Sequence, residues 1–73
     1  MAKEVVEVPI TGKIISVESK AGDTVKEGDV LCFIESMKME NPILAPVGGK
    51  VTQIDVKVGE VVEAGKPLAT IEY

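Results

Sequence analysis

Histidine, arginine and tryptophan are all absent from this chain of 73 residues. Without histidine, the Ser/His/Asp triads and most zinc sites cannot be built. The sequence also contains no Gly-x-Gly-x-x-Gly or Walker-type loop, the segments that usually cradle phosphates. We therefore predict that the chain has no catalytic residues of its own and no metal site.

Cysteine occurs once, at Cys32, which excludes an intrachain disulfide and is typical of a reducing compartment. Cys32 lies in the apolar run Val30–Ile34, where we predict a buried, unreactive thiol. That run is too short to span a membrane, and the first eight residues lack the apolar stretch of a signal peptide. The net charge of −4 argues against a nucleic-acid partner. We expect a cytoplasmic protein that neither inserts into membranes nor binds nucleic acid.

The chain contains the same segment twice. Pro9–Glu35 aligns without a gap to Pro46–Glu72, at an offset of 37 residues, and ten of the 27 positions are identical. Two copies are too few for a solenoid. Folded on each other they give an approximate two-fold axis within one domain, residues 1–73, and we expect the joining segment Ser36–Ala45 to lie near that axis.

Each copy has the pattern of short β-strands. Apolar and polar residues alternate in GKIISVESKAG and in GKVTQIDVKVG, and glycines recur at matched turns. No window has a helical period, so we predict an all-β fold, either a flattened barrel or a two-sheet sandwich. The expected strands are Glu4–Val8, one within Gly12–Gly22, Thr24–Lys26, Val30–Glu35, Met39–Leu44, one within Gly49–Gly59, Val61–Glu63 and Leu68–Glu72.

The joint between the copies is a hairpin tip, Ser36–Met39, between VLCFIE and ENPIL. Two-residue hairpin turns favour pairs such as Asn-Gly, because both central residues take positive φ. Met37-Lys38 suits such a turn poorly, so the turn is either of another type or mildly strained. Pairing around the tip also places Glu35 beside Glu40, a like-charge pair. Stability does not explain these residues, and we predict that the tip is functional.

The stretch ESMKM resembles the EAMKM signature of biotin carboxyl carrier domains. AGDTVKEGDVL and VGEVVEAGKPL resemble the paired turns of the wider biotinyl/lipoyl attachment domain family, and the resemblance covers Val8 to Glu72. It implies a flattened β-barrel, or barrel-sandwich hybrid, of two four-stranded antiparallel sheets with pseudo-two-fold symmetry. It also implies that Lys38 carries covalent biotin as a post-translational modification.

The flanking residues Glu35, Met37 and Met39 match the rest of that signature, whereas Ser36 departs from the commoner alanine. We expect both methionines to be exposed and to form an adaptable contact surface. The thumb segment that some acetyl-CoA carboxylase carriers insert between positions equivalent to Val17 and Val25 is absent here.

The resemblance implies a carrier rather than an enzyme. Biotin on Lys38 would act as a swinging arm that takes a carboxyl group in one active site and delivers it in another. The expected partners are a biotin protein ligase and the biotin carboxylase and carboxyltransferase or decarboxylase subunits of a biotin-dependent carboxylase, decarboxylase or transcarboxylase. Candidate parent enzymes include the acetyl-CoA, propionyl-CoA, methylcrotonyl-CoA and pyruvate carboxylases and decarboxylases such as methylmalonyl-CoA decarboxylase.

Two other functions remain open at this point. The first is a lipoyl carrier domain of a 2-oxo acid dehydrogenase complex, in which the lysine typically stands in Asp-Lys-Ala. The second is an unmodified adaptor module like that of membrane-fusion proteins, which long coiled-coil helices usually flank. The methionines on either side of Lys38 favour biotin over lipoate, and the lack of helical heptads disfavours the adaptor.

Overall fold

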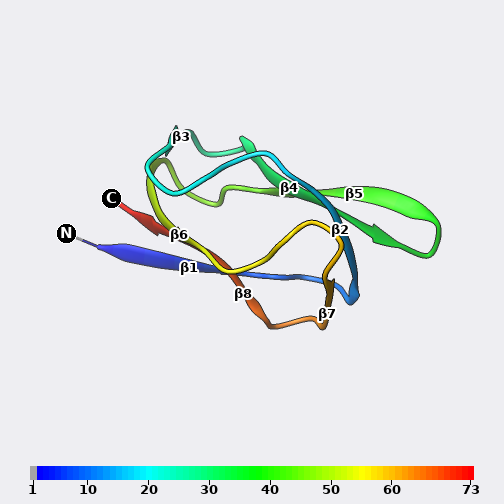
Figure 1. Ribbon diagram of the computed structural model, residues 1–73. Helices are drawn as coiled ribbons and strands as arrows, with labels where there is room; N and C mark the ends of the chain where they lie inside the picture. Colours follow the sequence, from blue (N-terminus) through cyan, green and yellow to red (C-terminus); the bar gives the residue numbers. More distant parts are fainter. Residues whose placement is uncertain (1) are drawn as a thin grey trace.

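The computed structural model describes residues 2–73, which form eight β-strands (Figure 1). Within this range there is no helix, and hence none that could cross a membrane. The strands agree with the predicted ones to within about two residues at each end, the usual uncertainty of such boundaries. They are β1 (Lys3–Glu7), β2 (Gly12–Val17), β3 (Thr24–Val25), β4 (Val30–Ser36), β5 (Met39–Leu44), β6 (Gly49–Ile54), β7 (Val61–Val62) and β8 (Pro67–Glu72).

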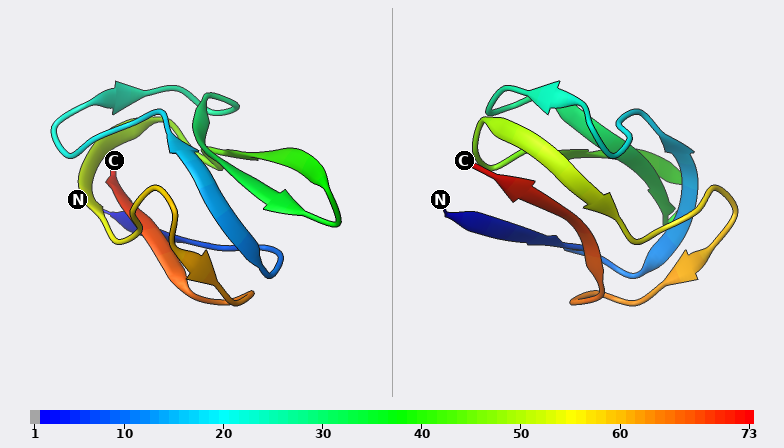
Figure 2. Two further views of the ribbon diagram at one scale, coloured as in Figure 1. Left: turned by 45° about the vertical axis from the view of Figure 1, so that its right-hand side comes forward. Right: turned by 60° about the vertical axis from the view of Figure 1, so that its left-hand side comes forward.

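The strands form two four-stranded antiparallel sheets that pack face to face (Figures 1 and 2). The first sheet has the order β1-β8-β6-β3 and the second β5-β4-β2-β7. Moving each strand by the repeat offset turns β1 into β5, β8 into β4, β6 into β2 and β3 into β7, so one sheet maps onto the other. The predicted all-β flattened barrel of two such sheets is confirmed.

Backbone hydrogen bonds repeat with the same symmetry. The Gly22 amide donates to the Val51 carbonyl at 2.7 Å, and in the other copy the Gly59 amide donates to the Ile14 carbonyl at 2.7 Å. Both glycines have positive φ, 101° and 90°, which a residue without a Cβ adopts at little cost. The pseudo-two-fold symmetry therefore reaches down to individual turns.

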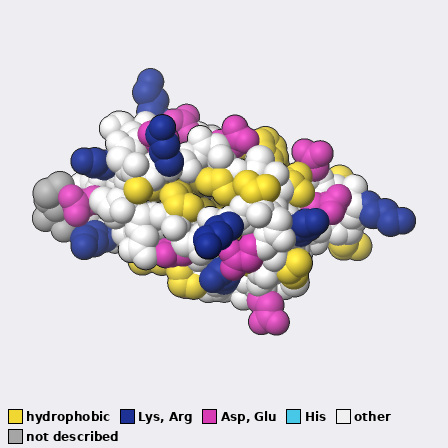
Figure 3. All heavy atoms as spheres, viewed as in Figure 1, with side chains coloured by type: hydrophobic (Ala, Val, Ile, Leu, Met, Phe, Trp, Pro, Cys, Tyr) yellow, Lys and Arg dark blue, Asp and Glu magenta, His cyan; other side chains and the backbone are white. Residues whose placement is uncertain are grey.

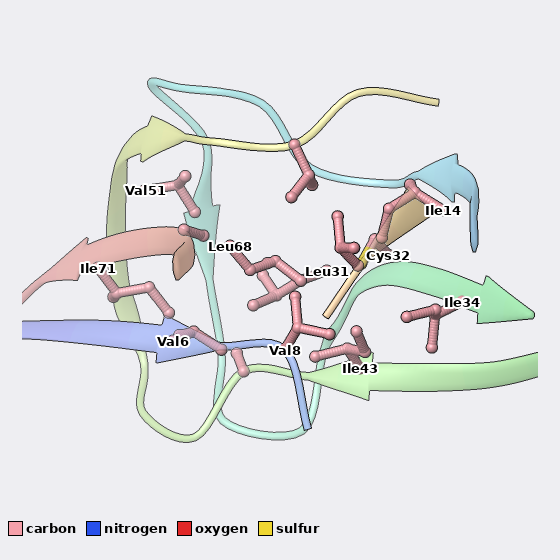
Figure 4. Close-up of a cluster of buried hydrophobic side chains, with 14 of the residues drawn as sticks. Val6, Val8, Ile14, Leu31, Cys32, Ile34, Ile43, Val51, Leu68 and Ile71 are labelled. Carbon is pink, nitrogen blue, oxygen red and sulfur yellow. The ribbon is translucent and has the colours of Figure 1, made fainter. Parts of the chain in front are cut away.

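One apolar core lies between the sheets (Figure 4). Leu31 and Leu68 are 0% and 1% exposed, so matched positions of the two copies are buried as predicted. Cys32 is also buried, and this burial raises the pKa of its thiol to about 11, as expected for an unreactive cysteine. The buried apolar residues are Val6, Val8, Ile14, Val25, Leu31, Cys32, Ile34, Ile43, Ala45, Val51, Val56, Val62, Leu68, Ala69 and Ile71.

The molecule is elongated, measuring 37 × 18 × 16 Å along its principal axes. The β4–β5 turn lies at one end, and the described chain ends lie at the other (Figures 1 and 2). There Ala2 and Tyr73 exchange two backbone hydrogen bonds of 2.8 and 2.9 Å. By the repeat offset, Tyr73 is equivalent to Ser36 and Ala2 to Met39. The two-fold rotation exchanges these two ends of the molecule, so its axis passes midway between them. The expectation that the joint lies near the axis is therefore wrong.

Candidate functional site

The hairpin formed by β4 and β5 has a two-residue turn. Ser36 and Met39 form the last residue pair of the ladder, which leaves Met37 and Lys38 as the only turn residues. Their φ angles are 55° and 64°, both in the left-handed region that type I′ hairpin turns require. Of the two predicted alternatives, the strained turn is observed. A Cβ is sterically unfavourable in this region, so neither Met37 nor Lys38 stabilises the turn.

The three side chains at the tip project into solvent. Met37 is 91% exposed and Met39 66%, and Lys38 is exposed between them. In Figure 3, a basic side chain projects from the end of the molecule that carries the β4–β5 turn, with hydrophobic side chains beside it. Large apolar side chains left this exposed are available for contact with another molecule. The predicted exposure of both methionines is confirmed.

The register of the hairpin brings like charges together. Glu35 lies directly opposite Glu40, and on its other side Glu35 faces Lys13 of β2. The side-chain amide of Asn41 donates to the Met39 carbonyl at 3.2 Å and braces the start of β5. Among residues 2–73, no carboxylate forms an ion pair with Lys38. The amine of Lys38 is therefore free of partners from this part of the chain.

The turn end of the hairpin is held closely by β2. A Cβ added to Gly12 would collide with the backbone carbonyl oxygen of Glu35. The symmetry-related Gly49 would collide in the same way with the carbonyl oxygen of Glu72. Glycine at position 12 thus lets the backbones of β2 and β4 approach at the residue that begins the ESMKM stretch. The tip is consequently exposed, but the residue directly before it packs closely against β2.

Lys38 is the group at this tip that could hold a cofactor. Its amine can accept an acyl group, and the exposed turn leaves room for a modifying enzyme. No group of three or more His, Cys, Asp or Glu residues within the described range is arranged to hold a metal ion.

The sequence analysis did not predict a groove that lies beside the start of β4. A comparison of the charges at equivalent positions of the two repeat copies could have indicated it.

Similar proteins include subunits of acyl-CoA decarboxylases and carboxylases. The chain is 54% identical over 39 residues to the gamma subunit of glutaconyl-CoA decarboxylase from Acidaminococcus fermentans, with 53% of this chain and 27% of that one covered. It is 50% identical over 42 residues to the gamma subunit of methylmalonyl-CoA decarboxylase from Veillonella parvula, covering 58% and 33%. To the mitochondrial alpha chain of human propionyl-CoA carboxylase it is 46% identical over 37 residues, covering 51% and 5%.

Among solved structures, the urea carboxylase of Kluyveromyces lactis superposes with a TM-score of 0.91 at 36% identity. The superposition covers 99% of this chain and 6% of the urea carboxylase. The chain spans a third or less of the length of each of these relatives. Residues 4–71 also match the biotin/lipoyl attachment family described as "Biotin-requiring enzyme". With nearly its whole length matched, this chain belongs to that family.

Proposed function

We propose that the chain is a biotin carboxyl carrier in which Lys38 holds biotin through an amide bond. The observation that carries this proposal is the setting of Lys38, exposed on a strained two-residue turn between two exposed methionines. Backbone strain persists where the surrounding structure enforces it and is concentrated at functional sites. Residues that give the hairpin no stability are best explained by recognition and chemistry at the tip.

The tip fits biotin in two respects. Lys38 has a flexible four-carbon stem and, within residues 2–73, no ion-pair partner that would compete for its nitrogen. The thioethers of Met37 and Met39 are polarizable and adaptable, which suits contact with an uncharged bicyclic group and with enzyme surfaces. When bound, biotin supplies a ureido nitrogen that can hold a carboxyl group.

Lys38 acquires this group as a nucleophile. In its unprotonated form, Nζ attacks the carboxyl carbon of biotinyl-adenylate and forms the amide bond, AMP leaves with the electrons of the broken C–O bond, and the amine loses a proton. A separate biotin protein ligase supplies the adenylate. Glu35, Met37 and Met39 present the surface by which the ligase distinguishes this tip from a lipoyl tip.

The chain itself contributes tethering rather than catalysis. A group attached to Lys38 meets each partner active site at a high effective concentration, because both encounters become intramolecular within the assembled enzyme. The partners are a biotin carboxylase and a carboxyltransferase or decarboxylase subunit. The similarity to gamma subunits of decarboxylases and to a carboxylase alpha chain supports an acyl-CoA decarboxylase or carboxylase as the parent enzyme. We place the carrier, as a single domain of residues 1–73, in the cytoplasm.

A modification assay tests this function. Purified unmodified protein is incubated with ATP and either biotin plus biotin ligase or lipoate plus lipoate ligase. Intact mass is expected to rise by one biotin, located on Lys38 by peptide mapping, with little lipoyl addition. Lys38→Ala is expected to give no signal on a streptavidin blot. Biotin on another lysine, or lipoylation as fast as biotinylation, would contradict the proposal.

A second pair of substitutions tests the role of the methionines. Met37→Asp with Met39→Ala moves the tip toward the lipoyl pattern, and we expect lipoylation to increase and biotinylation to decrease. Both side chains are exposed, so the melting temperature should stay unchanged. Unaltered rates with both ligases would show that neither methionine takes part in cofactor selection.

A further inference from the structure

The two copies of the repeat allow equivalent surface positions of this molecule to be compared with each other. Equivalent positions of the two copies meet the same backbone demands, because strand pairing and turn hydrogen bonds recur at the offset of 37 residues. Where equivalent exposed positions differ in charge or polarity, the fold does not require the difference. Several such differences lie at one groove.

This groove, of about 460 Å³, lies between the β2–β3 segment and the beginning of β4. Three carboxylates line it, those of Glu18, Asp23 and Asp29, and none of its lining residues is a lysine. Val30 and Phe33 of β4 add apolar surface. The groove therefore combines negative charge with a hydrophobic wall.

The equivalent positions of the second copy are closer to neutral. Lys66 stands at the position of Asp29, and its Nζ lies 3.7 Å from the carboxylate of Glu60, the equivalent of Asp23. Asp55 is the equivalent of Glu18. The three positions thus sum to −1 in the second copy, from two carboxylates and one lysine, and to −3 in the first. In the first copy, the cation that would balance Asp23 is replaced by another anion.

The largely buried residue Ser19 lies at the same groove. Ser19 is a buried polar residue, 6% exposed, that lines the groove, whereas its equivalent in the second copy is the buried apolar residue Val56. Within residues 2–73, the hydroxyl of Ser19 makes no hydrogen bond. Every fully enclosed polar side-chain atom of this range does have a partner, so the hydroxyl must open to the groove. The hydroxyl is therefore accessible from the groove, where it can form a hydrogen bond with a ligand.

Apolar surface continues outward from the groove over the second sheet. Phe33 lies opposite Pro42 in the ladder, and Val30 lies opposite Leu44, which is 48% exposed. Directly opposed residues share a face, so this strip is contiguous. In the other sheet, the equivalents of Phe33 and Leu44 are Thr70 and Glu7. At these two positions one outer face of the molecule is apolar and its symmetry mate is polar.

We propose that the groove and the adjoining strip form a docking site for a partner polypeptide that presents a Lys or Arg side chain beside an apolar one. The cation lies among the carboxylates of Glu18, Asp23 and Asp29 and donates a hydrogen bond to the Ser19 hydroxyl. The apolar side chain covers Phe33 and Leu44. Charge complementarity of this kind steers the encounter and selects the partner.

Other occupants fit less well. A nucleic acid or an anionic membrane would be repelled by the carboxylates and by the net charge of −4. No described group of carboxylates is arranged to hold a metal ion. The proposal adds a partner contact to the carrier function but requires neither Lys38 nor biotin, so the two can fail separately.

NMR titration of the unmodified, ¹⁵N-labelled protein tests the site. The probe is the peptide acetyl-Leu-Arg-Leu-amide, and acetyl-Leu-Glu-Leu-amide is the charge control. We expect saturable amide shifts concentrated in residues 18–33 with the arginine peptide, at a dissociation constant on the order of 1 mM, and none with the glutamate peptide. Shifts scattered over both copies, or equal binding of both peptides, would overturn the proposal.

Substitutions taken from the second copy sharpen the test. Asp29→Lys with Phe33→Thr introduces the residues that the fold carries at the equivalent positions, so the variant should fold. We expect its dissociation constant for the arginine peptide to rise about tenfold, which corresponds to about 1.4 kcal/mol. Glu63→Lys makes the same change of charge outside the groove and should leave binding within about twofold. Unchanged affinity in the double variant would refute the site, and so would calcium chloride shifting the same amides at lower concentrations than the peptide.

Discussion

Replacing Lys38 by glycine is expected to stabilise the fold while removing the amine. Lys38 has a φ of 64°, and the left-handed conformation costs a residue with a Cβ about 1–2 kcal/mol. Glycine avoids that cost but loses more backbone freedom on folding, which offsets about 0.5–1 kcal/mol. Pairing the low ends and the high ends of these two ranges gives a net stabilisation of about 0.5–1 kcal/mol.

Lys38→Ala is the matched control for this experiment. Alanine also lacks the amine but retains the Cβ, so the strain of the turn stays, and stability should remain within about 0.5 kcal/mol of wild type. The difference between the glycine and alanine variants thus isolates the strain. For a domain of this size 1 kcal/mol corresponds to about 4–8 °C in melting temperature, so the glycine variant should melt about 2–8 °C higher.

Urea denaturation followed by circular dichroism measures the free energy of unfolding of the three proteins. Similar slopes against urea concentration would show that the surface exposed on unfolding is unchanged. A glycine variant less stable than the alanine variant would refute the idea that the turn is strained. An alanine variant that melts more than about 5 °C lower would show that the Lys38 side chain supports the structure.

Three further outcomes are expected. Leu31→Ala and Leu68→Ala should each lower the free energy of unfolding in urea by about 2–5 kcal/mol, and by similar amounts, because both leucines are buried at equivalent positions; a large loss for one alone would contradict equivalent packing. Burial raises the pKa of Cys32 from 9.0 to about 11, so the thiol of the unfolded chain ionises at a lower pH than that of the folded chain. Stability should therefore fall between pH 9 and 11, by up to about 2–3 kcal/mol, and Cys32→Ala should lack this component in parallel urea titrations. Glu40→Lys places a cation opposite Glu35 and should raise the melting temperature slightly, by the equivalent of about 0.2–1 kcal/mol; a decrease would show that the pair does not repel.

Much of the architecture could be predicted from the repeat and from residue alternation. Alternation is a local pattern, and the repeat relates one segment to another. Together they correctly predicted the strand positions, the matched burial of Leu31 and Leu68, and the hairpin tip. The pairing of Glu35 with Glu40 followed from the tip alone. The role of Lys38 rests on its resemblance to a family signature, and its modification stays a prediction.

Other features depend on contacts that no local pattern encodes. Each sheet combines strands of both copies, as in the pairing of β3 with β6, and alternation specifies only which face of a strand is buried. The turn at Met37 and Lys38 had two possible geometries, because its residues contradict the usual turn chemistry. The joint was wrongly expected near the symmetry axis, since the repeat implies an axis without fixing its direction.

The meeting of the described chain ends opposite the β4–β5 turn has a mechanical consequence (Figure 1). Any polypeptide attached at Ala2 or Tyr73 would leave from the end of the long axis furthest from Lys38. The domain would then act as a lever of about 37 Å whose pivot is the attachment point and whose moving end bears the lysine. A small rotation at the pivot displaces the tip by many times the movement near the pivot. The reach of a group on Lys38 would be determined more by the angle of this rod than by the length of the side chain.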